Sequence, residues 1–300
     1  MSKTSARSPR SAARAQSQPG RPGRRPSARE RLAAERAARK RAEKRRRMLI
    51  ALGSVTAVVA AAATLITVSL TSSPAPLTAS ESVAPAAVVR QVTSVPSSVL
   101  TQVSPGRVAT PLHQVTASGP PLTVGGKPAI EFVSEESCPF CAAERWSLTV
   151  ALSHFGTFDH LGVTHSAAND VFPNTATLSF RDTRYHSSLL TLHTTELTDN
   201  AGHTLQNPTT LDRQLIGQFD VPPYVNSADQ SGAVPFLDIG NRYILAGAQY
   251  DPQVLAGLSA TQIAAQLRNP SSPVAQAIDG SASVIIAAIN QVLNHQASQG

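Results

Sequence analysis

The strongest constraint on the fold of this chain is one segment near its middle, residues 129–156. Residues 129–133, Ala-Ile-Glu-Phe-Val, are mostly apolar and β-branched or aromatic, which predicts a buried strand. A polar turn follows, then Cys138-Pro139-Phe140-Cys141 and a helical run to Gly156. Proline fits the first helical position because its missing N–H would have no partner there. The segment therefore predicts a strand that leads into a helix whose first turn carries Cys-x-x-Cys.

Cys138 and Cys141 are the only cysteines in the chain. Their spacing at a helix start puts the two sulfurs on one face, within reach of a disulfide. The unpaired N–H groups at the helix N-terminus stabilise a thiolate, which favours Cys138 as the attacking thiol. Cys141 lies one turn further inside the helix and suits the resolving role. The pair is predicted to be redox-active.

Two other interpretations of the cysteine pair remain open at this point. The cysteines could form an inert structural disulfide, or they could be half of a zinc site. Zinc would need two more ligands, and His154, His160 and His165 are not spaced as a second ligand pair. We therefore expect no metal and no bound cofactor, only a Cys138–Cys141 disulfide as the redox group.

The charge of the chain is divided unevenly. Residues 1–47 hold 17 Lys and Arg against three Glu, a net charge of +14, whereas the remainder holds nine basic and 16 acidic residues, a net charge of −7. The basic tail is poor in large apolar residues and cannot bury enough surface to fold alone. It would fit a surface that binds nucleic acid or anionic lipid, or a solvated cytoplasmic flank. We favour the flank and expect no nucleic-acid partner.

The preference comes from residues 48–70, which carry no charge over 23 positions. As a helix they would be about 34 Å long, enough for a hydrocarbon core of roughly 30 Å. The positive-inside rule keeps residues 1–47 in the cytoplasm. The stretch is too long for a signal-peptide core and no clean cleavage site follows, so a signal anchor in the lipid bilayer is favoured over cleaved secretion or a buried core helix. The cysteines would then lie outside the cytoplasm, where disulfides persist.

The remaining sequence divides into a linker at 71–108 and a domain at 109–295. The linker is rich in Ser, Pro, Ala and Thr, and it contains valines every three or four positions from Val88 to Val103, which predict two short amphipathic helices broken at Pro96. Within the domain we expect an irregular polar region after Gly156. Strands are then predicted over 175–180 and 188–197, and helices over 209–219, 259–267 and 281–295.

The second informative stretch is residues 232–245, an apolar strand, a Gly-Asn turn and a second strand, which predict a hairpin. Pro235 stands at the start of a strand that otherwise looks central, an unusual place for proline. A cis Val234–Pro235 bond lying against Cys138 would account for it.

The order of these elements resembles the thioredoxin fold, and the approach Glu131-Phe132-Val133-Ser134 to the Cys-Pro-Phe-Cys motif resembles the DsbA branch. The fold implied is α/β, a central mixed sheet flanked by helices, with an insertion and a preceding single transmembrane helix. In DsbA-like enzymes an acidic residue on the catalytic strand lies under the cysteines, and Glu131 matches it with one extra residue in the turn. Val234 also matches the residue before their cis proline.

A closer resemblance is to the membrane-anchored family catalogued as domain of unknown function 929, over roughly residues 85–295. It rests on Gly126-Lys127-Pro128, Cys138 through Trp146, Phe155-Gly156, Pro173 through Thr177 and Pro235 through Asn241. The family's usual cysteine near the C-terminal helix is absent, since Ile289-Asn290 stands there.

The leading hypothesis is a membrane-anchored, extracytoplasmic thiol–disulfide oxidoreductase that acts on protein thiols or disulfides and is recycled by a membrane redox partner. Its catalytic residues would be Cys138, Cys141 and the proton relay Glu131. The expected substrate-binding residues are Val234, Pro235, Pro139, Phe140, Trp146 and Phe236, although aromatic residues beside such a helix are also common in a core. The alternative is a surface-anchored binding or scaffold domain in which Cys138–Cys141 is a structural disulfide.

Overall fold

The computed structural model describes residues 82–103, 105, 108–115, 119–225 and 232–298. Of the two units into which the chain divides, the second, residues 77–300, contains all the described residues. The predicted basic tail at 1–47 and membrane anchor at 48–70 lie outside the described residues. Among the helices that the structure describes, none is both long enough and apolar enough to cross a bilayer.

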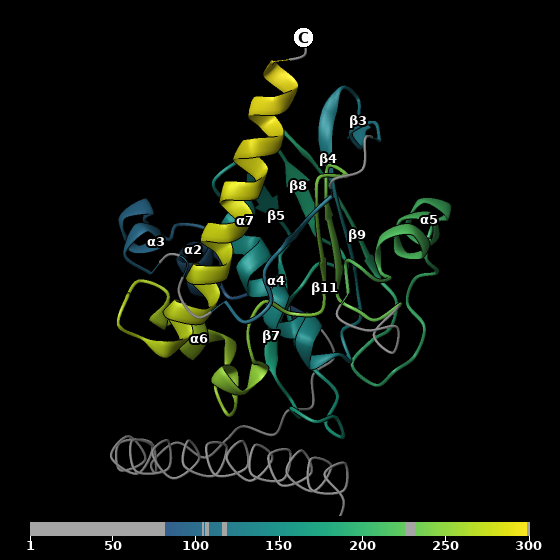
Figure 1. Cartoon of the computed structure of the whole chain (residues 1–300). Coiled ribbons are helices and arrows are strands. Elements are labelled where there is room, and N and C mark those ends of the chain that lie inside the picture. The colour runs from purple at the N-terminus through teal and green to yellow at the C-terminus, as the bar shows by residue number, and fades with distance from the viewer. Residues whose placement is uncertain (1–81, 104, 106–107, 116–118, 226–231, 299–300) are drawn as a thin grey trace, which may run out of the picture. The chain divides into compact units, whose positions relative to one another are not determined.

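A six-stranded mixed sheet forms the centre of the second unit, and β4 (Lys127–Ser134) lies in its middle (Figure 1). Strand β10 (Phe236–Ile239) runs antiparallel to β4, and β9 (Thr191–Glu196) runs parallel to it. The other strands are β11 (Tyr243–Ala246), which pairs with β10, β2 (His113–Gln114), which pairs with β11, and β3 (Thr123–Val124), which pairs with the start of β4. The predicted strand at 129–133 is thus confirmed and is longer at both ends.

Helices cover the two faces of this sheet. Helices α4 (Pro139–Leu152) and α7 (Pro273–Ala297) pack on one face, and α5 (Thr210–Phe219) packs on the other. Because successive side chains of a strand point to opposite faces, Ile130 and Phe132 join the core under α4 and α7 while Val133 joins the cluster under α5. The molecule is therefore a mixed α/β domain, as predicted.

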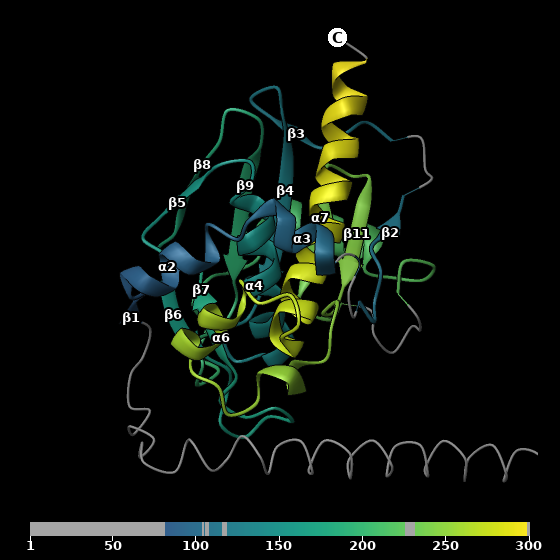
Figure 2. The same cartoon turned by 90° about the vertical axis from the view of Figure 1, so that its left-hand side faces the viewer.

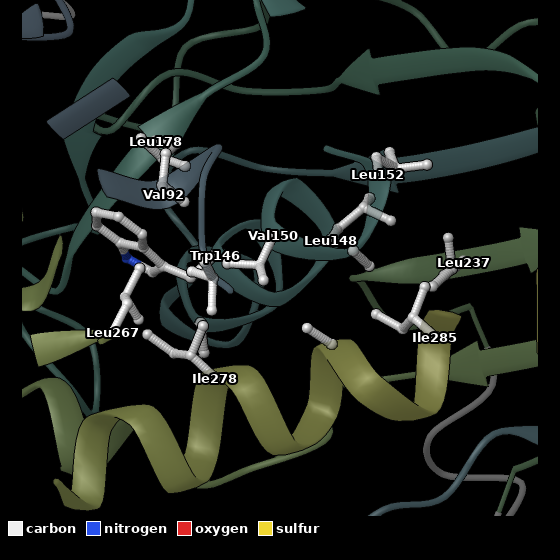
Figure 3. Close-up of a cluster of buried hydrophobic side chains, with 14 of the residues drawn as sticks. Val92, Trp146, Leu148, Val150, Leu152, Leu178, Leu237, Leu267, Ile278 and Ile285 are labelled. Atoms are coloured by element: carbon white, nitrogen blue, oxygen red, sulfur yellow. The ribbon is translucent and has the colours of Figure 1, made fainter. Parts of the chain in front are cut away.

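The main hydrophobic core lies between the sheet, α4 and α7 (Figure 3). Trp146, Leu148 and Leu237 have no more than a trace of exposed surface, and Ile278 and Ile285 of α7 pack against them. Burying each such side chain contributes roughly 1.5–3 kcal/mol. This core fixes the N-terminal end of α4 relative to the strands.

The two valine-rich helices are confirmed as α2 (Ala86–Val92) and α3 (Ser97–Val103), separated at Pro96. Their regularly spaced valines are all buried, so the predicted periodicity marks the face that docks on the domain. Helix α2 contacts α6 (Ala260–Gln266), and α3 contacts α7 (Figure 2).

The prediction of an irregular region after Gly156 was wrong. This part of the chain forms two small sheets, one of three strands and one of two. The strands are β1 (Ser82–Val83), β6 (Gly162–His165) and β7 (Ala176–Ser179) in the first, and β5 (Thr157–Asp159) and β8 (Arg184–His186) in the second. Of these, β7 lies within the strand predicted over 175–180, which is confirmed. They are two to four residues long and polar, and they form through pairing with distant segments, which gives little local signal.

The remaining predictions agree with the structure apart from one helix start. The 232–245 hairpin, the helix after Thr209 and the helix after Ser259 are confirmed, the last two with a capping box. The last helix begins at Pro273 rather than at Ser281. Pro273 occupies the first turn of α7, a position that suits proline because its missing N–H would have no partner there.

Candidate functional site

The two cysteines lie where β4 leads into α4, as predicted. Cys138 is the residue before the first helical position, and its Sγ accepts the backbone N–H of Cys141 at 3.3 Å. Cys138 is half-buried and Cys141 is fully buried, and both are free thiols. The Cys141 Sγ accepts the N–H of Glu135 at 3.4 Å. Only the sulfur of Cys138 is therefore accessible to a partner.

The environments of the two thiols push their pKa values apart. The hydrogen bond with Cys141 lowers the pKa of the Cys138 thiol against the opposing effect of burial, and the N–H groups of Cys141 and Phe140 and the charge of Arg145 lower it further. Burial raises the pKa of the Cys141 thiol well above its usual range. Cys138 is therefore the thiol of the pair that ionises more readily.

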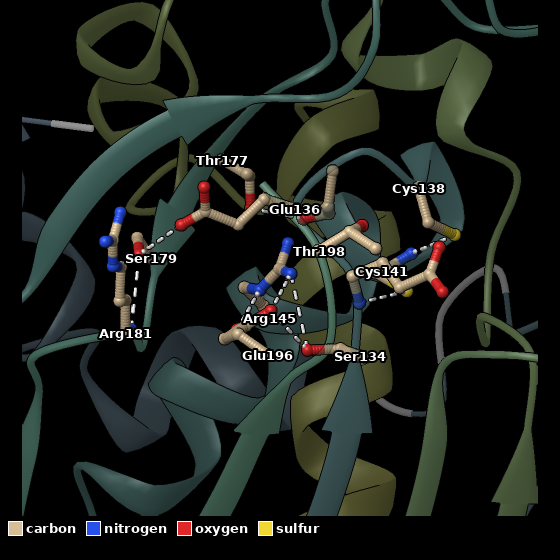
Figure 4. Close-up of polar contacts among 12 residues, drawn as sticks. Ser134, Glu136, Cys138, Cys141, Arg145, Thr177, Ser179, Arg181, Glu196 and Thr198 are labelled. Atoms are coloured by element: carbon tan, nitrogen blue, oxygen red, sulfur yellow. Dashed lines mark hydrogen bonds and ion pairs between the residues drawn. The ribbon is translucent and has the colours of Figure 1, made fainter. Parts of the chain in front are cut away.

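Arg145 supplies the positive charge beneath the cysteines (Figure 4). It lies one turn after Cys141 on α4 and is fully buried. Its Nε and Nη2 donate to the two carboxylate oxygens of Glu196 at 2.9 and 2.6 Å, and Nη2 also reaches the hydroxyl of Ser134 at 3.3 Å. Ser134 and Glu196 are register partners on the parallel strands β4 and β9, and the serine hydroxyl donates to the same carboxylate at 2.8 Å.

Hydrogen bonds to Thr198 and to Ser179 hold the turn between β4 and the cysteines. The N–H of Glu136 donates to the carbonyl of Thr198 at 2.9 Å, and the hydroxyl groups of Ser137 and Thr198 lie 2.9 Å apart. The buried carboxylate of Glu136 accepts the hydroxyl of Ser179 on β7 at 2.7 Å (Figure 4). These contacts anchor the turn to β7 and to the end of β9, which fixes the position of Cys138.

The Val234–Pro235 bond is cis, which confirms the prediction for this position. Pro222–Pro223 is a second cis bond, which was not predicted. The Cys138 thiol faces the carbonyl oxygen of Val234 at 3.7 Å. Two segments that are far apart in the chain, the start of α4 and the start of β10, therefore meet at the accessible sulfur.

The predicted groove residues are only partly surface residues. Phe140 is 38% exposed and packs edge-to-face on Phe172 at 5.7 Å between ring centroids. Trp146 and Phe236 are fully buried, and Pro139 and Pro235 are buried as well. The assignment of Trp146 and Phe236 as groove walls was therefore wrong. Trp146 belongs to the core under α4, where its indole N–H donates to the Ala176 carbonyl at 3.0 Å, and Phe236 belongs to the cluster under α5.

Glu131 is buried, but on the sheet face away from α4. Its carboxylate accepts a hydrogen bond from His193 Nδ1 at 2.7 Å, and it faces α5 together with Val133. The charged groups that act on the Cys141 thiol are Cys138 and Arg145. The proton relay through Glu131 stays a prediction. The neighbours of the Glu131 carboxylate are instead His193 and Asp212. These three residues offer ligand atoms that all lie within 4.8 Å of one another.

Three residues near the cysteines were not predicted as site residues from the sequence: Arg145, Glu196 and Phe172. Arg145 had a signal, because a residue four positions after Cys141 lies on the same helix face. Glu196 and Phe172 had none, since their proximity depends on the register of β9 and on the path of the loop before β7.

Residues 113–291 match the model of a family described as a domain of unknown function (DUF929). The chain belongs to this family. The matched segment begins in β2 and ends within α7, so the DUF929 domain contains the central sheet, both cysteines and the cis proline. Helices α2 and α3 precede the DUF929 match although they pack against the same core. No curated protein and no solved structure matches the chain.

Proposed function

We propose that the protein is a thiol–disulfide oxidoreductase that acts on protein thiols and disulfides through Cys138 and Cys141. The observation that carries this proposal is the asymmetry of the two thiols. One is half-exposed, hydrogen-bonded at a helix N-terminus and has a lowered pKa, whereas the other is fully buried, has a raised pKa and is in hydrogen-bond contact with the first. A structural disulfide needs no such difference, but a nucleophile and its resolving partner do.

In the reducing direction the Cys138 thiolate attacks one sulfur of a substrate disulfide. A bond forms between Cys138 and that sulfur, and the other substrate sulfur leaves as a thiolate. Cys141 then attacks the Cys138 sulfur, and its proton goes to the second departing substrate sulfur. The substrate gains two electrons and the Cys138–Cys141 disulfide remains. In the oxidising direction the same steps run backwards, and a substrate dithiol is converted to a disulfide.

Arg145 supports this chemistry from below without touching the substrate. Its charge stabilises the Cys138 thiolate, and the bidentate contact with Glu196 keeps the guanidinium in one position. The thiolate is thus favoured before the substrate binds, and little reorganisation is needed when the thiolate leaves the mixed disulfide again.

The surface around Cys138 suits an extended polypeptide. Phe140 and Phe172 present an aromatic pair beside the sulfur, and Val171 in the same loop is 71% exposed. On the other side lies the backbone of Val234, whose carbonyl faces the Cys138 sulfur at 3.7 Å and which would pair with a peptide bound there. An unfolded segment with an apolar side chain near its cysteine would match both features.

The finer fold assignment belongs to the same proposal. Strand β4, helix α4 and the parallel strand β9 form a βαβ unit, and the hairpin β10–β11 and helix α7 complete the sheet and the layer over α4. This order, with Cys-x-x-Cys between β4 and α4 and a cis proline before β10, supports a thioredoxin-like domain in which β5 to β8 are an insertion.

We further propose that residues 48–70 anchor the domain in the cell membrane, with residues 1–47 in the cytoplasm and the cysteines outside it. The support is the charge step at the uncharged stretch. Because the chain has no third cysteine, a separate membrane protein of the quinone-linked or dithiol class would reoxidise or reduce the pair.

The test is trapping of mixed disulfides by single cysteine variants of the full chain. Cys141→Ser should accumulate disulfide-linked adducts with other proteins, because Cys138 still attacks but nothing resolves the product. Cys138→Ser is the matched control and should trap none. Equal trapping by both variants would contradict the assignment of Cys138. Trapping by neither, with slow alkylation of Cys138 near neutral pH, would favour the alternative, a surface-anchored binding domain.

A further inference from the structure

A row of ionisable side chains crosses three strands on the sheet face under α5. Asp238 on β10, Glu131 on β4 and His193 on β9 are register partners, so all three side chains lie side by side on one face. Asp212, in the first turn of α5, lies against the same face of the sheet as this row. Its Oδ2 accepts the hydroxyl of Thr195, two residues after His193, at 2.9 Å.

Two of the four groups have buried oxygen atoms with no hydrogen-bond partner. Asp212 is 1% exposed and its Oδ1 is unpartnered, and Asp238 is fully buried with Oδ2 unpartnered. An unpartnered buried polar atom costs about 1–3 kcal/mol. The other oxygens of these carboxylates are used, Oδ2 of Asp212 by the cap of α5 and Oδ1 of Asp238 by the N–H of Asn241 at 2.7 Å. Fixed carboxylates with free oxygens are what a cation would satisfy.

The donor set identifies the type of cation. One imidazole nitrogen and two carboxylate oxygens, from His193, Glu131 and Asp212, lie within 4.8 Å of one another. A nitrogen and oxygen set of this kind is typical of Zn²⁺, Mn²⁺ or Fe²⁺, and Ca²⁺ and Mg²⁺ prefer oxygen ligands alone. The side chain of His193 is 51% exposed, which leaves a route from solvent to the ligands and an open position for water.

We propose that Glu131, His193 and Asp212 form a binding site for a divalent transition-metal ion, with Zn²⁺ the best match. The ion would take the place of the proton between His193 Nδ1 and the Glu131 carboxylate. Asp238 lies beside Glu131, as its register partner on β10, without being one of the three ligands. The site joins α5 to two strands of the sheet, on the face opposite α4.

The cysteines have to be removed from the measurement because thiolates also bind zinc. Zn²⁺ and, separately, Ca²⁺ are titrated calorimetrically into the full chain carrying Cys138→Ser and Cys141→Ser. This background makes the result independent of the proposed redox function. We expect one Zn²⁺ per chain with a dissociation constant well below millimolar, and weaker binding of Ca²⁺.

The deciding variant in this background is His193→Gln, because His193 is half-exposed and its replacement does not disturb the core. We expect Zn²⁺ affinity to fall about tenfold or more, as is typical when the coordination of a metal is disturbed. The matched control is His186→Gln, since His186 is also exposed and also bonds a carboxylate, Asp159, at 2.9 Å. This control should change the affinity less than about twofold.

Three results would overturn the proposal: no zinc binding below millimolar, loss of less than about twofold with His193→Gln, or an equal loss with His186→Gln. The first would mean that His193 and Glu131 are only an ion pair. Glu131→Gln provides a second variant, and its affinity should fall together with that of His193→Gln. An unchanged affinity for Glu131→Gln would also count against the site.

Discussion

The two faces of the central sheet carry charged clusters of opposite character. Under α4, Arg145 meets Glu196 in a closed ion pair, with both side chains fully buried. Under α5, Glu131 and Asp212 lie around one half-exposed histidine, Asp238 lies beside Glu131, and one oxygen each of Asp212 and Asp238 has no partner. The first cluster is neutral and nearly complete by itself, whereas the second is acidic and incomplete.

The difference follows from the parity of positions along two strands. Ser134 and Glu196 point toward α4, and Glu131 and His193, three residues earlier in each strand, point toward α5. The α4 side has a cation that can neutralise the carboxylate. The α5 side has only an imidazole near the solvent boundary. Carboxylates close together on neighbouring strands can therefore have different roles. Glu196 is paired with the guanidinium beneath the cysteines, whereas Glu131 lies in a cluster that is open to a cation.

Breaking the ion pair should have the largest effect. Glu196→Gln leaves the Arg145 guanidinium charged, buried and without its counter-ion, so the free energy of unfolding should fall by roughly 3–5 kcal/mol. Glu131→Gln, the matched change under α5, should cost less than about 1 kcal/mol because its partner His193 remains half-hydrated. Urea denaturation measures both. Similar losses for the two variants would contradict the distinction between the faces, and the double variant R145M/E196M should recover most of the loss.

The pH dependence of stability should be dominated by the layer that covers α4. Burial raises the pKa of Asp279 on α7 to about 8, so the folded protein holds a proton that the unfolded chain releases. Its stabilising effect is complete below pH 4 and is lost as the pH rises toward 8. From Asp279 alone we expect the unfolding free energy to fall by roughly 2–4 kcal/mol between pH 5 and pH 8.

Asp279→Asn should remove the largest single share of the total slope, as measured by denaturation at a series of pH values. Further shares come from Glu144 on α4 and from Asp238, since burial raises the pKa of each carboxyl to about 7, and from Asp220, whose pKa burial raises to about 6. A variant with the same slope as the wild type would show that Asp279 ionises freely in the folded state.

The reactivity of Cys138 should depend on the α4 face alone. In R145M/E196M the thiolate loses the nearby guanidinium, so alkylation of Cys138 by iodoacetamide at pH 6 should slow by roughly fivefold, corresponding to about 1 kcal/mol of Coulomb stabilisation. His193→Gln should leave the rate unchanged. A slower reaction in both variants would mean that the α5 face also acts on the thiol.

The smallest effect is expected from the cap of α5. Thr209 accepts the N–H of Asp212 at 3.0 Å, and Thr209→Ala should lower the unfolding free energy by about 0.5–1 kcal/mol. Thermal denaturation gives the loss, and the alkylation rate of Cys138 is the control and should not change. A change in that rate would mean that the α5 face of the sheet also affects the Cys138 thiol, which would contradict the distinction between the two faces.

Several elements carry strong local signals in the sequence. The Ser-Cys-Pro junction predicts the start of α4, the Gly-Asn turn predicts the β10–β11 hairpin, and the segments beginning at Thr209 and Ser259 predict α5 and α6. The valine spacing in 88–103 gave two helices and their buried faces. These predictions succeeded because each depends on backbone preferences and hydrogen bonds within a few residues.

The surroundings of the cysteines depend instead on contacts between segments that are far apart in the chain. The separation in the sequence is 51 residues for Arg145 and Glu196, 62 residues for Glu131 and His193, and 96 residues for Cys138 and Val234. The face to which Glu131 points depends on the register of β9 and β10, since a shift of one residue would move every side chain to the other face. Local sequence carries no record of that register, because it is fixed by packing the whole core against both faces of the sheet.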